Sequence, residues 1–100
     1  MIDYVVLFRL IDGAPGELVD ELIGTLTELS GRLDGVLEYR VGRDAGIRPD
    51  NDDFAIVARF RDRSALDAYL LHPEHLAIIT RYVPQLVAEK HAAQLVSESD

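Results

Sequence analysis

The sequence contains no cysteine among its 100 residues. Disulfide bonds, thiolate metal sites and cysteine nucleophiles are therefore excluded, and the composition fits a reducing compartment. We accordingly expect a cytoplasmic protein. Long apolar runs are missing as well, since Asp3 and Arg9 bracket the first hydrophobic stretch. We therefore expect neither a transmembrane helix nor an ordinary signal peptide.

Basic residues are few relative to acidic ones. The chain has 10 lysine and arginine residues against 18 aspartate and glutamate residues, and its formal net charge is −8. Nine of the ten basic residues are arginine, and they are scattered along the chain. An acidic surface of this kind repels phosphate backbones and anionic lipids. We therefore predict no nucleic-acid partner and no membrane partner.

The length and the remaining composition indicate one globular domain. Hydrophobic residues make up 48% of the chain and charged residues 28%, which is ordinary for a protein with a packed core. A chain of this length has the usual size of a single domain. We predict one domain over residues 1–96 and a frayed tail over residues 97–100, because short chain ends are seldom held in place.

The predicted order of elements is β-α-β-β-α-β. Strands are expected in four segments rich in β-branched and aromatic residues, at 2–11, 36–43, 54–61 and 91–96. The first helix is indicated by leucines at helical spacing, at Leu18, Leu22, Leu26 and Leu29. A second helical region is interrupted at Pro73, and Pro84 should end or kink it. This order predicts an α+β, ferredoxin-like fold, with a four-stranded antiparallel sheet and the helices on one face.

Both faces of the predicted sheet are apolar. On the first strand, the face that should meet the helices carries Tyr4, Val6, Phe8 and Leu10. The opposite face carries Val5 and Leu7, and Val57 joins it from the third strand. A sheet covered on one side normally shows polar residues on the other side. Burying such side chains contributes about 1.5–3 kcal/mol each, so we predict a homodimer formed through the open sheet face.

Polar side chains are predicted to converge between the helices and the sheet. His75 shares a helical face with Ile79 and Tyr82, while Tyr69 and Tyr4 face the same space from the preceding helical piece and the first strand. We predict a cavity there for a small apolar molecule, with His75 and Tyr69 as candidate catalytic residues. The candidate ligand-binding residues are Tyr4, His72, Tyr69 and His75. A hydrogen-bonded structural role is the alternative for His75 and Tyr69.

No metal or cofactor site is predicted. His72 and His75 are three positions apart, but Pro73 interrupts the helix between them and only the distant His91 could follow as a third ligand. We expect His72 to cap a helix or turn beside Pro73. The acidic loop 45–53 lacks the glycine and glutamate of an EF-hand, and the sequence has no glycine-rich phosphate loop.

The sequence resembles the stress-responsive dimeric α/β-barrel family over nearly its whole length. The resemblance is carried by the start MIDYVVLFRL, by Gly42 at the end of the second strand, by the run FAIVARF, and by ALDAYLLHPEH from Ala65 to His75. Its most specific part is Tyr69-x-x-His72-Pro73-x-His75. The resemblance implies two sheets packed face to face in a homodimeric barrel. Members of the family include stress-induced proteins of undefined chemistry and a plant polyketide cyclase.

Two positions depart from the pattern that the resemblance implies. Family members commonly carry a histidine in the first strand where this chain has Tyr4, and Leu26 stands where the cyclase has a pocket tyrosine. The cyclase is thought to use the first-strand histidine together with the one that matches His75, with a tyrosine matching Tyr69 nearby. This chain therefore retains part of that site.

Three classes of function are compatible with the sequence. The first is a small-molecule binding or stress-response protein without turnover. The second is a cofactor-free enzyme, cyclase-like or monooxygenase-like, that uses His75 as acid or base. The third is a purely structural dimerisation domain. An open cavity lined by His75, Tyr69 and Tyr4 would favour the first two classes, and a space filled by side chains would favour the third.

Overall fold

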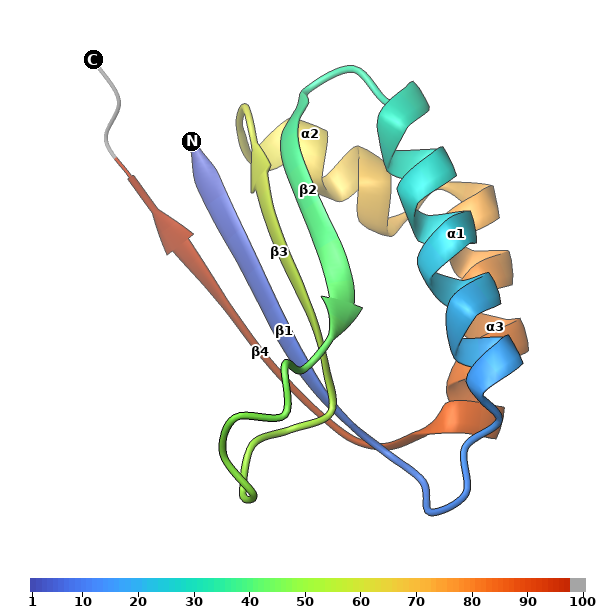
Figure 1. The fold of residues 1–100 in the computed structure, drawn as a ribbon. Helices are drawn as coiled ribbons and strands as arrows, with labels where there is room; N and C mark the ends of the chain where they lie inside the picture. The colour runs from blue at the N-terminus through green and yellow to red at the C-terminus, as the bar shows by residue number, and fades with distance from the viewer. Residues whose placement is uncertain (98–100) are drawn as a thin grey trace.

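Four strands and three helices make up the computed structural model, which describes residues 1–97. In order they are β1 (Ile2–Leu10), α1 (Gly16–Arg32), β2 (Val36–Arg43), β3 (Phe54–Phe60), α2 (Arg63–Leu70), α3 (Pro73–Leu86) and β4 (Val87–Val96). The strands form one antiparallel sheet in the order β2-β3-β1-β4. Figure 1 shows the helices on one face of the sheet, while no helix of the described chain covers the other. The predicted α+β, ferredoxin-like fold is confirmed.

The alternation of side chains along the central strands forms the core. On β1, Val6 is fully buried against the helices while Leu7 is exposed on the open face. On β3, Ile56 is likewise buried and Val57 is exposed. The register pairs Val6 with Ile56 and Leu7 with Ala55, so the buried side chains of both strands lie on the same face of the sheet, toward the helices. The core therefore lies between the sheet and the helix layer.

Side-chain caps begin the two C-terminal helices. Before α2, the Asp62 carboxylate accepts a hydrogen bond from the Ala65 N–H at 2.8 Å. Before α3, His72 Nδ1 accepts one from the Glu74 N–H at 3.1 Å. Pro73 occupies the first turn, where its missing N–H leaves no helical bond unmade. The predicted break at Pro73 and the capping role of His72 are both confirmed.

Gly35 allows the turn between α1 and β2 to approach α2. Its φ is +89°, and a Cβ at this position would lie 2.7 Å from the Ala65 Cβ. Its carbonyl oxygen also accepts a hydrogen bond from the Arg61 N–H at 2.8 Å. A residue with a side chain would therefore strain the backbone and displace the start of α2.

Some boundaries differ from the predicted ones. The last strand begins at Val87 rather than at His91, and α3 continues through Pro84 to Leu86. The first residues of β4 pair with the end of β1 across a register shift, so pairing with a distant strand sets this boundary. The strands β1 and β3 each end one residue earlier than predicted. Of the predicted tail, only Ser97 lies within the described residues, and its N–H donates to the Met1 carbonyl at 3.0 Å.

No helix within residues 1–97 is both long enough and apolar enough to cross a bilayer. Over the same range, no three histidine, cysteine, aspartate or glutamate side chains gather closely enough to hold a metal ion.

Candidate functional site

A cavity of about 290 Å³ lies between the helices and the sheet. Its wall is formed by Tyr4, Phe8, Leu22, Leu26, Phe54, Ile56, His75, Ile78, Ile79, Val83, Val87 and Lys90. Only Tyr4, His75 and Lys90 bring polar side-chain atoms to this otherwise apolar wall. The exposed members of the wall are Ile79 on α3 and Lys90 on β4. The mouth of the cavity therefore lies between α3 and β4.

His75 presents one ring nitrogen to the cavity. The residue is 5% exposed, and its Nδ1 lies 3.1 Å from the Leu70 carbonyl oxygen. A carbonyl oxygen can only accept, so Nδ1 carries the proton of the neutral ring. Nε2 has no hydrogen-bond partner within residues 1–97, and no fully buried side-chain nitrogen or oxygen in that range is left unpaired. Nε2 is therefore accessible, and the accessible space beside His75 is the cavity.

The surroundings of His75 favour its neutral form. Burial lowers the pKa of the imidazole most, and the charges of Lys90 and His72 lower it further. The hydrogen bond with the Leu70 carbonyl raises the pKa and opposes these effects. The net direction is downward from 6.5, so the ring is neutral at neutral pH and its Nε2 lone pair can accept a proton or a hydrogen bond.

Tyr4 places a second polar atom in the cavity. The residue is 8% exposed, and burial raises the pKa of its phenol. The hydroxyl therefore stays protonated at neutral pH. It has no hydrogen-bond partner among the described residues. Since no fully buried polar side-chain atom in that range is left unpaired, the hydroxyl is accessible from the cavity. A molecule in the cavity could accept a hydrogen bond from it or donate one to it.

Tyr69 supports His75 from behind and does not line the cavity. Its fully buried ring lies 4.4 Å from the His75 ring, centroid to centroid, and 6.2 Å from the Tyr4 ring. Its hydroxyl lies 2.6 Å from the hydroxyl of Tyr39. Desolvation raises the pKa of both Tyr39 and Tyr69, so each stays a neutral phenol. Tyr69 can therefore orient His75, but it does not reach the cavity.

Of the residues predicted for the site, His72 does not line the cavity. It is half-buried, and its Nδ1 is occupied by the Glu74 N–H. The fold brings Tyr4 and His75 together at the cavity and packs Tyr69 behind them.

Sequence reasoning missed two residues of this region. Tyr39 lies opposite Ala58 on the inner face of β2, and its place could have been found from the alternation of that strand. Lys90 was missed because the last strand was expected to begin after it. In the observed register Lys90 pairs with Phe8, which places it on the inner face of β4.

The sequence family described as Dabb, Stress responsive A/B Barrel Domain, matches residues 2–95. The chain belongs to this family. A comparison with curated proteins finds no match.

Several solved structures share the fold of this Dabb domain. A dimeric ferredoxin-like protein of unknown function from Thermobifida fusca YX is 29% identical, with a TM-score of 0.86 over 96% of this chain and 90% of that one. A Dabb family protein from Mesorhizobium loti MAFF303099 is 22% identical, with a TM-score of 0.76 over 98% and 97%. A hydroxynitrile lyase from Passiflora edulis is 16% identical, with a TM-score of 0.80 over 99% and 95%. At 22% and 16% identity, the last two likenesses show the fold alone.

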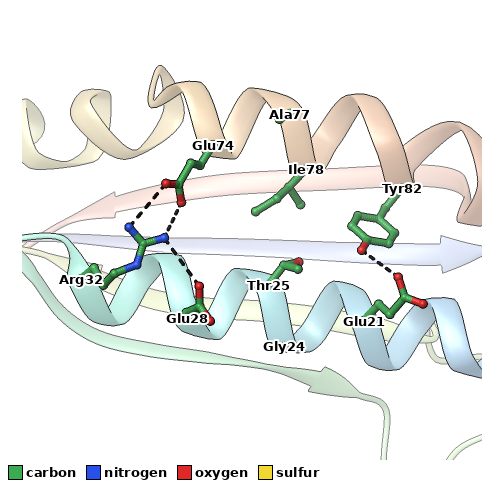
Figure 2. A pocket seen from close by; sticks show the side chains of 9 residues that line it. All are labelled: Glu21, Gly24, Thr25, Glu28, Arg32, Glu74, Ala77, Ile78 and Tyr82. Atoms are coloured by element: carbon green, nitrogen blue, oxygen red, sulfur yellow. Dashed lines mark hydrogen bonds and ion pairs between the residues drawn. The ribbon is translucent and has the colours of Figure 1, made fainter.

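The Dabb domain also has a larger groove of about 590 Å³ on the outside of the α1–α3 pair. Figure 2 shows that its charged side chains already contact one another: Arg32 reaches Glu74 and Glu28 at one end, and Tyr82 reaches Glu21 at the other. Between these pairs, Ile78 extends from α3 toward α1. Ile78 also lines the inner cavity, so it forms part of the partition between groove and cavity. The Arg32–Glu74 and Tyr82–Glu21 pairs link the two helices. The Tyr4 hydroxyl and His75 Nε2 at the inner cavity, by contrast, have no partner within residues 1–97.

Proposed function

We propose that this Dabb domain is a homodimer that binds one small apolar or aromatic molecule in the cavity between α1, α3 and the sheet. The observation that carries the proposal is an apolar wall whose buried part holds two polar atoms without a partner in residues 1–97, the Tyr4 hydroxyl and His75 Nε2. Ligand sites commonly have this form, with few polar groups that fix the orientation of the ligand. A bound molecule that pairs with these atoms would offset the free energy lost by holding them away from bulk water.

The open face of the sheet supports the homodimer. Leu7 and Val57 are 42% and 44% exposed there, and their burial against a second sheet would be favourable. One charged pair on this face is already neutralised within the chain, since Arg59 Nε lies 2.7 Å from Asp3 Oδ1. A partner could therefore cover Arg59 and Asp3 without leaving either charge unpaired. The similar protein from Thermobifida fusca is described as dimeric.

The binding proposal is tested by filling the cavity. Benzamide is small, neutral and aromatic, and its binding should shift the NMR signals of His75 and Tyr4. Leu26→Trp should abolish these shifts, because the larger side chain projects from the cavity wall. Ile47→Trp, in the exposed loop between β2 and β3, is the matched control and should bind benzamide like the wild type. Equal binding by the Leu26→Trp variant would contradict the proposal.

A second candidate function is cofactor-free acid–base catalysis with His75 Nε2 as the proton acceptor. It is favoured by the neutral ring and its accessible Nε2, and by the similarity of the fold to that of a hydroxynitrile lyase. The measurement is release of benzaldehyde from mandelonitrile, a hydroxynitrile, by the wild type and by His75→Phe. Tyr69 would act only through His75. Equal rates in the two proteins would contradict this candidate.

The third class, a purely structural dimerisation domain, is the conclusion if no small molecule enters the cavity while the dimer forms. The cytoplasmic location and the lack of nucleic-acid, membrane and cofactor partners are inferred from the sequence alone and stay predictions.

A further inference from the structure

Lys90 is the one cationic side chain on the cavity wall, and it has no partner of opposite charge among the described residues. Seven arginines form ion pairs with carboxylates. Lys90, the only lysine of the sequence, forms none within residues 1–97. Arg40 and Arg48 also form no ion pair in this range, but neither lines the cavity. Lys90 is therefore distinguished by its place, as an unpaired cation beside an apolar cavity.

Neither the neighbouring carboxylate nor the cavity wall supplies a partner for Lys90. Neighbouring Glu89 lies on the opposite face of β4, where its Oε2 is 3.8 Å from Arg9 Nε. The cavity wall itself contains no aspartate or glutamate. An anion at the mouth of the cavity would therefore meet Lys90 without a competing carboxylate on the wall.

The polar groups of the cavity lie at different depths. Lys90 is exposed at the mouth, whereas His75 and Tyr4 are buried in the wall farther inside. A ligand that used all three would have an apolar body in the interior and a negative charge near the solvent. The flexible stem and the three donors of a lysine suit a single oxyanion at such a site.

We propose that Lys90 makes the cavity selective for small carboxylic acids with an apolar ring or chain, bound with the carboxylate at Lys90 and the apolar part against α1 and α3. This inference rests on the proposed binding function and adds the class of ligand. Lys90 is then the residue that distinguishes an acid from a neutral molecule of the same shape.

The test compares benzoate with benzamide, which match in shape and differ in charge, by calorimetry or NMR titration. Wild-type protein should bind benzoate about fivefold more tightly than benzamide, as expected for an ion pair partly open to water. Lys90→Met keeps most of the apolar stem and should remove this preference while benzamide binds as before. Arg48→Gln, an exposed loop residue without an ion pair in the described chain, removes the same charge elsewhere and should keep the preference. Added salt should weaken the binding of benzoate only.

The outcomes separate this inference from the proposal on which it rests. If both probes bind and Lys90→Met binds benzoate as tightly as the wild type, the role of Lys90 is wrong while the binding function stands. If Arg48→Gln loses the preference to the same extent, net charge rather than Lys90 is responsible, and the inference is also wrong. If neither probe binds the wild type, the binding function fails and the inference fails with it. Unchanged benzamide binding shows that the Lys90→Met variant is folded.

Discussion

The hydroxyl pair of Tyr39 and Tyr69 provides a direct test of the packing behind His75. The two oxygens lie 2.6 Å apart, and each is the other's only hydrogen-bond partner within residues 1–97. The perturbations are Tyr39→Phe, Tyr69→Phe and the double variant, which remove one or both hydroxyls and keep both rings. Because ring packing is preserved, the change in unfolding free energy should report the hydrogen bond.

The two single variants should differ because the hydroxyls differ in burial. Tyr69 is fully buried and Tyr39 is half-buried. Tyr39→Phe leaves the Tyr69 hydroxyl without a partner and away from water, which should cost about 1–3 kcal/mol. Tyr69→Phe leaves a hydroxyl that water can reach more easily, so its cost should be about 1 kcal/mol or less. The double variant leaves no unpaired hydroxyl, and it should lose about 1 kcal/mol less than the sum of the single losses.

The assay is urea unfolding followed by circular dichroism, with linear extrapolation to water. All variants are compared at one protein concentration, because the stability of a dimer depends on concentration. In thermal unfolding, each kcal/mol of lost stability should lower the Tm by about 4–8 °C. Tyr82→Phe is the control, since its hydroxyl donates to Glu21 at 3.0 Å. Its effect should simply add to that of Tyr39→Phe.

Additive losses would refute this account. If the Tyr39→Phe and Tyr69→Phe losses sum to that of the double variant within about 0.3 kcal/mol, the two hydroxyls do not bond in solution. Tyr69 would then have no anchor on β2, and the explanation of how the His75 ring is oriented would fail.

Two further predictions concern the sheet face and the buried histidine. Val57→Asp should convert the dimer to monomer or aggregate, as measured by light scattering, while Leu71→Asp, at an exposed helix end, should stay dimeric. A wild type that is monomeric at micromolar concentration would contradict the homodimer. The folded pKa of His75 is lowered, so the unfolded chain binds the proton more tightly, and unfolding free energy should fall as the pH drops below about 6.5. His75→Phe should lack this part of the pH dependence, and His91→Phe should keep it. If the unfolding free energies of the wild type and His75→Phe depend on pH in the same way, the lowered pKa of His75 is wrong.

The element order and the direction of most core side chains followed from local patterns. Leu22, Leu26 and Leu29 recur at helical spacing and are buried, and the alternation of Tyr4, Val6 and Phe8 correctly predicted the buried face of β1. These predictions succeed because a helix or strand repeats its geometry every few residues, so a short stretch of sequence shows which side is apolar. The capping role of His72 was predictable for the same reason, since Pro73 marks the start of the next helix.

The site was only partly predictable. The spacing of His75, Ile79 and Tyr82 correctly predicted that His75 faces the interior, and the alternation of β1 did the same for Tyr4. The partner of the Tyr69 hydroxyl and the place of Lys90 could not be read locally. Tyr39 is 30 residues from Tyr69, and Lys90 reaches the cavity wall because β4 pairs with β1 from Val87 onward.

Local sequence was thus enough for the fold, the apolar sheet faces and the inward direction of Tyr4 and His75, because each depends on a repeat within one element. The cavity, its mouth at Lys90 and the support of His75 by Tyr69 and Tyr39 were decided by tertiary structure. They depend on the register between strands and on contacts among α2, α3 and β2, and these long-range pairings minimise the free energy of the whole chain rather than of any single segment.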